Sequence, residues 1–203
     1  MHKQIISGGC LRASPVFHRD ILELEGRYSD SKQKFDASLI AGCVRCRFGK
    51  VQVLVCRPFS VKMRPFPTTF WLVCPYLTHR AGMLESRGGV RELEASITDF
   101  REWRRYNILH QEIRLNLMEK FALRAARKYQ PKIFRSVMRS GIGGMKQAET
   151  VSVKCLHLQT ASFIALGKHP GSDWLERQGL GARGQGLCSD CGGDRSYCQP
   201  CSL

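Results

Sequence analysis

The hydrophobic positions of the chain form short β-branched runs first and longer stretches of helical spacing afterwards. Residues 51–55 (Val-Gln-Val-Leu-Val) and residues 68–73 predict two strands. Prolines 58, 65 and 67 lie between these runs, and because proline cannot donate to a strand ladder they mark the connection. The pattern predicts a β-hairpin or a pair of neighbouring strands.

Helical spacing dominates the middle of the chain. Pro75 suits the first turn of a helix that we expect to run to Arg87, where Gly88 and Gly89 stop it. Residues 90–129 contain no proline or glycine, and apolar side chains recur there at intervals of three or four residues, the spacing of a buried stripe. This stripe consists of Trp103, Tyr106, Leu109, Ile113, Leu117 and Phe121. Pro131 ends or bends the helical stretch.

Two more helices are expected near the end of the chain. Residues 141–144 (Gly-Ile-Gly-Gly) predict a loop, residues 153–166 predict a mostly apolar helix, and Ser172 or Asp173 can cap a short helix through Trp174. The expected fold class is α+β, a helix-rich single domain over residues 43–178 with a small antiparallel β element. Residues 1–42, with one helical turn at 21–25, are expected to be a poorly ordered basic arm, and residues 179–203 a cysteine-rich tail.

Length and composition narrow the class of protein. A chain of 203 residues with 43% hydrophobic residues fits one ordinary domain with a real core. No run approaches the roughly 18 apolar residues of a membrane span, and the first ten residues do not read as a secretory signal. We therefore expect a cytoplasmic protein, in which the ten cysteines are thiols or metal ligands.

The charge points towards anionic partners. The net charge is +15, and between Arg101 and Arg139 there are eleven Lys or Arg against three Glu. Helical spacing places four basic residues, Lys120, Arg124, Arg127 and Lys128, on one side of a helix. Such a stripe can follow the phosphates of a nucleic acid or bind another phosphorylated ligand, and a plain solvated helix face is the alternative. No recognised motif for reading bases accompanies it.

The tail carries a candidate metal site. Cys188, Cys191, Cys198 and Cys201 form two Cys-x-x-Cys pairs separated by six residues. Four thiolates complete a tetrahedral structural site for Zn²⁺, so the spacing predicts a zinc knuckle. An iron–sulfur cluster uses the same ligands, and a frayed terminus with unrelated cysteines is the alternative without a metal.

A second candidate site combines Cys46, Cys74, Cys155 and His157. Cys46 precedes the first predicted strand and Cys74 ends the second, so antiparallel pairing would bring these two ends together. The glycine-rich loop would then bring Cys155 and His157 to the same end. We therefore expect these four side chains to form a Cys₃His zinc site. Buried cysteines that act only as small hydrophobic residues are the alternative.

The same residues admit a catalytic interpretation. A cysteine at a helix N-terminus can act as a nucleophile, with His157 as its base. The backbone of Gly141, Gly143 and Gly144 could form a nest of N–H groups for an anion. A glycine-rich segment is more often only a turn, and this one is not a Walker sequence.

Several short motifs resemble those of a bacterial protein family, domain of unknown function 501. They are Pro65-Phe-Pro-Thr-Thr-Phe-Trp-Leu-Val-Cys-Pro-Tyr-Leu77, Leu84-Glu85 before Gly88-Gly89, Gly141-Ile-Gly-Gly144 and Val153-Lys-Cys-Leu-His157, in the family's order over residues 43–176. The family's name carries no function, and the resemblance implies cell-division partners only through gene neighbourhood.

These observations favour a metal-stabilised module that binds nucleic acid or another polyanion. The alternative is a thiol- or metal-dependent enzyme acting on an anionic small molecule. An open coordination position beside a pocket would favour catalysis, whereas a closed four-ligand site would favour a structural role.

Overall fold

A three-stranded antiparallel sheet forms the centre of the fold in the computed structural model, which describes residues 5–6, 9–10, 13–29, 35–46, 49–146 and 149–181. The strand order is β3 (Ile40–Arg45), β4 (Val51–Cys56), β5 (Phe70–Leu72). Strands β4 and β5 confirm the two predicted strands and their antiparallel pairing, with Leu54 opposite Trp71. Strand β3, which was not predicted, forms the hairpin with β4. A separate two-stranded ribbon joins β1 (Ile5–Ile6) and β2 (Gly9–Cys10).

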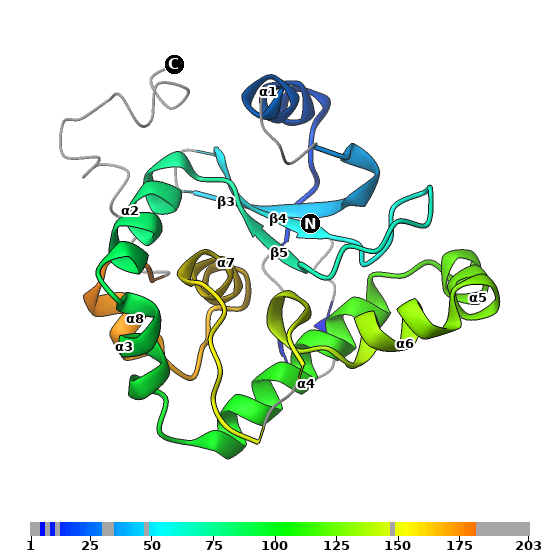
Figure 1. Cartoon of the computed structure of the whole chain (residues 1–203). Coiled ribbons are helices and arrows are strands. Elements are labelled where there is room, and N and C mark those ends of the chain that lie inside the picture. Colours follow the sequence, from blue (N-terminus) through cyan, green and yellow to red (C-terminus); the bar gives the residue numbers. More distant parts are fainter. Residues whose placement is uncertain are drawn as a thin grey trace.

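The sheet is covered on both faces. Along β4, Val53 and Val55 pack into the larger core, whereas Leu54 and Cys56 belong to a second cluster on the other face. Helix α1 (His18–Tyr28) covers this second face through Leu24, so that α1 and α7 lie on opposite sides of the sheet in Figure 1. This corrects the expected poorly ordered arm for residues 13–29 and 35–42. They form α1, a 3₁₀ turn η1 (Ala37–Leu39) and the start of β3.

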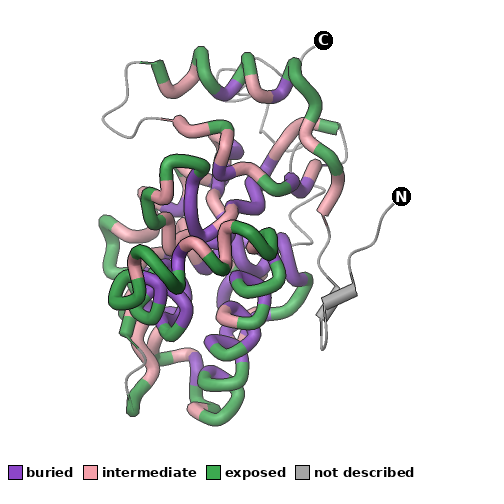
Figure 2. Tube along the Cα trace, turned by 90° about the vertical axis from the view of Figure 1, so that its right-hand side faces the viewer, coloured by how far each residue is buried: buried purple, intermediate pink, exposed green. Residues whose placement is uncertain are grey.

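Helix α7 (Leu156–Leu166) lies under the sheet and is buried along most of its length. It packs against β4, β5 and α2 (Pro75–Ser86). Around it lie α3 (Gly89–Ser96), α4 (Phe100–Asn116) and α8 (Ser172–Arg177), which follow α2 or α7 along the chain (Figure 1). Figure 2 shows the result, with buried segments inside and exposed turns on the outer helices.

The long helical stretch is divided into separate helices. Asp99 caps α4 by accepting from the N–H groups of Arg101 and Glu102, and the chain bends again after Leu117, before α5 (Lys120–Tyr129). The buried stripe is confirmed from Trp103 to Leu117, but Phe121 is 83% exposed because it lies on the next helix. Pro131 begins α6 (Pro131–Arg139).

The observed architecture confirms the predicted α+β class, with helices dominating and a small three-stranded antiparallel sheet at the centre. The predicted helix at 153–166 begins at Leu156, and the predicted loop at 141–144 contains a 3₁₀ turn, η2 (Ile142–Gly144). Among the described residues, no helix is both long and apolar enough to cross a bilayer.

Candidate functional site

Helices α5 and α6 form a strongly basic surface. Their inner faces pack Ala126 against Phe134 and Val137, together with Phe59 from the connection before β5. The outer faces carry exposed Lys and Arg side chains and neither helix contains an acidic residue. We call this set the α5–α6 basic surface: Lys120, Arg124, Arg127, Lys128, Lys132, Arg135 and Arg139.

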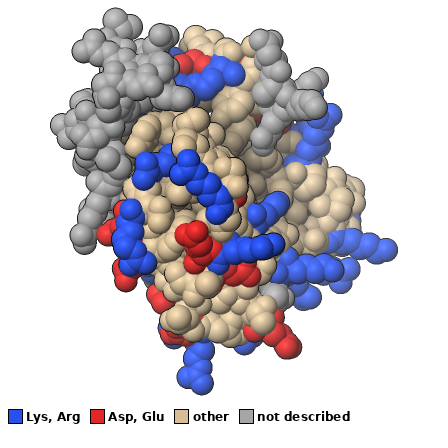
Figure 3. Space-filling view, turned by 60° about the vertical axis from the view of Figure 1, so that its left-hand side comes forward, with Lys and Arg blue, Asp and Glu red and all other residues tan. Residues whose placement is uncertain are grey.

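These charges are not neutralised by ion pairs within the described part of the chain. The salt bridges found there involve Arg27, Arg45, Lys50 and His157, and none reaches α5 or α6. On the face shown in Figure 3, basic side chains project from the surface in several places, most densely along the right-hand edge. The predicted stripe on α5 is therefore exposed, and α6 extends it.

An open hollow adjoins this surface. It has a volume of about 540 Å³ and is lined by Arg135, Arg139 and Lys146, with Ser136, Ser140 and Gly144 between them. All three basic side chains are exposed. The hollow therefore offers an anion several positive charges at once.

Two aromatic side chains accompany the charges on α5. Phe121 is 83% exposed, and its spacing of three and seven residues from Arg124 and Lys128 places it on the same side of the helix. Tyr129 is 71% exposed, and the Nζ atom of Lys128 lies 5.1 Å from the centre of its ring. Exposed rings among cations are typical of surfaces on which unpaired bases stack.

The glycine-rich loop does not present a row of free N–H groups. Gly141 N donates to Met145 O, and Ile142 N donates to the side chain of Asn107. The N–H groups of Gly144 and Met145 also donate within the loop. The geometry therefore does not favour the anion nest expected from Gly141, Gly143 and Gly144, and Gly144 contributes only to the wall of the basic hollow.

A buried arginine holds this loop in place. Arg114 of α4 is fully buried and donates to the carbonyl oxygens of Gly141 (3.0 Å), Pro67 (3.3 Å) and Ser140. Burial lowers its pKa to about 10. The cation thus ties α4 to the loop and to the segment before β5.

Glu85, Cys155 and His157 form a second candidate site. Each offers one donor atom, and these atoms lie within 4.8 Å of one another. Cys155 is the residue before the first turn of α7, His157 lies in that turn, and Glu85 comes from the last turn of α2. Glu85 Oε1 accepts from Leu156 N at 2.5 Å, so the carboxylate caps α7 from a different helix.

The ring of His157 is held on both sides. Its Nε2 atom lies 3.1 Å from the carbonyl oxygen of Thr78, and its Nδ1 atom lies 3.0 Å from Glu85 Oε1. Both partners can only accept, so both ring nitrogens donate and the ring is an imidazolium. The hydrogen bond with Cys155 is the largest cause of a raised pKa at His157, and the hydrogen bond and ion pair with Glu85 act in the same direction. Burial opposes them, and the resulting pKa of His157 is about 9.

The structure brings together only half of the predicted Cys₃His set. Cys46 lies in the β3–β4 turn, and Cys74 N donates to Gln52 O at the start of β4, so these two residues do flank the same strand end. However, neither joins the group formed by Cys155 and His157. Helix α2 explains this, because it begins after Cys74 and its eleven residues to Glu85 span about 16 Å. The tail residues Cys188, Cys191, Cys198 and Cys201 lie outside the described residues.

Both candidate sites lie within one segment of the chain that matches a family model. The model describes a protein of unknown function, DUF501, and it matches residues 43–177. The chain belongs to the DUF501 family. No curated protein and no solved structure shows significant similarity to it. The DUF501 match covers β4, β5, the second half of β3, α7 and the basic helices, whereas α1 lies before it.

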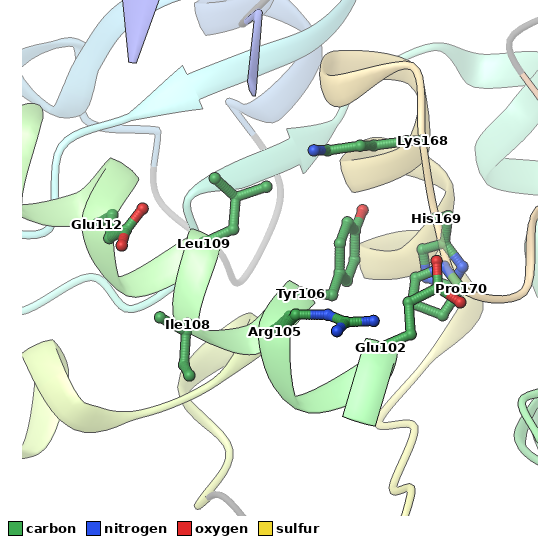
Figure 4. A pocket seen from close by; sticks show the side chains of 9 residues that line it. All are labelled: Glu102, Arg105, Tyr106, Ile108, Leu109, Glu112, Lys168, His169 and Pro170. Atoms are coloured by element: carbon green, nitrogen blue, oxygen red, sulfur yellow. The ribbon is translucent and has the colours of Figure 1, made fainter. Parts of the chain in front are cut away.

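Another hollow of this DUF501 fold lies between α4 and the turn at 168–170. It measures about 430 Å³, and Figure 4 shows Lys168 reaching over Tyr106 while Glu102 and Arg105 project from α4. The buried polar groups in its wall are already engaged. Tyr106 bonds to Ser162 at 2.5 Å, and His169 bonds to Gln159 at 2.8 Å. Its inner wall is therefore part of the core.

Glu85 is the site residue that sequence reasoning did not assign a role. It stands in the motif Leu84-Glu85 that carried part of the family resemblance, so a signal was present. The function of that motif becomes visible only once α2 is packed against α7.

Proposed function

We propose that this DUF501 protein binds nucleic acid through the α5–α6 basic surface. The observation that supports this is a set of seven exposed Lys or Arg side chains on two consecutive helices that contain no acidic residue. Uncompensated cations attract phosphates over long range and release counterions on contact. Lys146 and the adjoining hollow extend the positive surface beyond α6.

Single-stranded nucleic acid fits this surface best. A line of cations can follow the backbone of a single strand, while exposed Phe121 and Tyr129 offer stacking faces that a paired base cannot reach. Neither helix carries a recognised base-reading motif, so binding without strong sequence preference is expected. The second function considered, an enzyme acting on an anionic small molecule, depends instead on the group formed by Glu85, Cys155 and His157.

The test is binding of a labelled single-stranded oligonucleotide to the full chain, measured by fluorescence anisotropy over a series of salt concentrations. Changing Lys120, Arg124, Arg127 and Lys128 to Gln removes four cations that can bind phosphate. For single strands the salt slope falls by about 0.7 for each phosphate that is no longer bound, so we expect a slope flatter by about 3.

The control is a variant with the same change of charge elsewhere. Arg87, Arg91, Arg101 and Arg105 are exposed and lie outside α5 and α6. Changing these four to Gln lowers the net charge equally but should leave most of the slope intact. Equal effects of the two variants would reject a defined surface. Binding to anionic lipid vesicles in preference to the oligonucleotide would reject nucleic acid as the ligand.

A further inference from the structure

Glu85, Cys155 and His157 are the group within the described ranges whose donor atoms converge closely enough to share one ion. We propose that these three side chains bind one Zn²⁺ ion and leave its fourth coordination position to water. This inference is independent of the polyanion surface, and it replaces the predicted Cys₃His set by one that includes a carboxylate from α2.

The donor set suits zinc. Thiolate, imidazole nitrogen and carboxylate oxygen are its three common ligands, at about 2.0–2.3 Å from the ion. In a tetrahedral site two ligands of one ion lie about 3.3–3.8 Å apart. The three donor atoms here lie within 4.8 Å of one another, so they would have to approach by at most about 1.5 Å. Only small side-chain movements are needed to close the site.

The surroundings of His157 already have the form of an outer coordination shell. Metal-binding histidines usually donate their second ring N–H to a carbonyl or carboxylate, which fixes the orientation of the ring. Here Nε2 donates to Thr78 O at 3.1 Å, and Nδ1 faces Glu85 Oε1 at 3.0 Å. The ion takes the place of the Nδ1 proton, and the thiol gives up its proton on binding, so both protons pass to solvent.

The cap on α7 is compatible with this arrangement. Glu85 accepts from Leu156 N through Oε1, and a carboxylate has a second oxygen that can bind the ion. The positive end of α7 opposes a bare cation, but the thiolate and carboxylate bring two negative charges that the same helix end stabilises. Lys154 does not add a cation to the site, since its Nζ lies 3.4 Å from Gly143 O in the loop.

The proposed site is open. Three protein ligands with a water are the pattern of catalytic zinc, whereas structural zinc usually has four protein ligands. The side chains of His157 and Glu85 are 32% and 26% exposed, so the remaining position faces solvent. An ion there could polarise an anionic substrate, and its bound water would be available to attack that substrate.

The test uses the full chain with Cys188, Cys191, Cys198 and Cys201 changed to Ser, so that the tail cannot bind the metal. Titration with Co²⁺, a spectroscopic substitute for zinc, should show one equivalent bound with a sulfur-to-cobalt absorption band that Zn²⁺ abolishes. Cys155→Ala should remove the band. Glu85→Gln should weaken binding at least about tenfold, equal to about 1.4 kcal/mol.

Two features make the outcome decisive. Glu85→Gln keeps an oxygen that can accept from Leu156 N, and circular dichroism of each metal-free variant checks that the fold is retained. Cys46→Ala and Cys74→Ala are the matched controls, because both cysteines are buried and lie outside the group. A band that survives Cys155→Ala, or that disappears with Cys74→Ala, would overturn the site, as would the lack of stoichiometric cobalt binding.

Discussion

His169 is held as a neutral ring by its two hydrogen bonds. Its Nδ1 accepts from Gly171 N at 2.9 Å, which leaves Nε2 to donate to Gln159 Oε1 at 2.8 Å. The rings of Trp103, Tyr106 and Phe163 surround it. Burial lowers the pKa of His169 to about 3, and burial also lowers that of His110 well below its usual value.

This environment predicts a loss of stability in mild acid. Below about pH 6.5, His169 and His110 bind protons in the unfolded chain but stay neutral in the folded protein. The free energy of unfolding therefore falls as pH decreases. Each such proton contributes up to about 1.4 kcal/mol per pH unit. Urea denaturation between pH 7 and pH 5 measures the slope. His169→Asn should remove the contribution of up to one proton from this slope, even though it also lowers the free energy of unfolding at pH 7. An identical slope for the natural sequence and the variant would contradict a neutral His169 in the folded protein.

The exposed rings on α5 give a second prediction at the scale of single residues. Changing Phe121 and Tyr129 to Ala should weaken single-strand binding by roughly 1–3 kcal/mol for each ring on which a base stacks. The salt slope should stay the same, because the number of phosphates bound does not change. Anisotropy with single-stranded and duplex oligonucleotides separates the effects. An equal decrease in affinity for duplex would mean that the rings do not stack on bases.

At the scale of elements, α1 shows that a helix outside the family match can be part of the folded body. Leu24 is buried against Cys43, Leu54 and Val73, so α1 covers one face of the sheet. Arg45 of β3 also pairs with Asp20 of α1 at 2.6 Å. Helix and sheet are therefore joined by apolar packing and by an ion pair.

A pair of leucines on α1 tests this packing. Leu24→Ala should destabilise the protein by about 2–5 kcal/mol, because it opens a cavity over the sheet. Leu22 lies on the same helix but is 54% exposed, so Leu22→Ala should cost little. Thermal unfolding of the two variants measures the difference. Similar midpoints for both would mean that α1 does not support the sheet in solution.

For the whole molecule, the hydrophobic pattern predicted where most elements lie along the chain better than which elements pack against one another. The strands at 51–55 and 68–73 and the stripe from Trp103 to Leu117 follow from periodicity alone. Strand β3 was missed because its run contains Gly42 and little β-branching, although Gly42 allows the chain at Ser14 to pair closely with it. The end of the stripe was missed because Phe121 keeps the spacing while the chain turns.

The site was only partly predictable for a related reason. Cys155 and His157 are two residues apart, so their proximity follows from local sequence. Their third partner, Glu85, is separated from Leu156 by 71 positions and reaches the site only because α2 packs on α7. Spacing along the chain cannot reveal such a partner. Cys74 is the N-cap residue of α2, two positions after the end of β5, and the length of α2 carries Glu85 away from it.

The late position of α7 in the chain has a consequence for synthesis. The sheet is complete at Leu72, but the helix that covers its larger apolar face ends at Leu166, which is 94 residues later. At about 5–20 residues per second, a ribosome needs roughly 5–20 seconds to make that stretch. During this interval the face of the sheet that carries Val53 and Val55 lacks α7, although α2 and α4 are made earlier, so we expect the nascent chain to bind chaperones that recognise apolar segments.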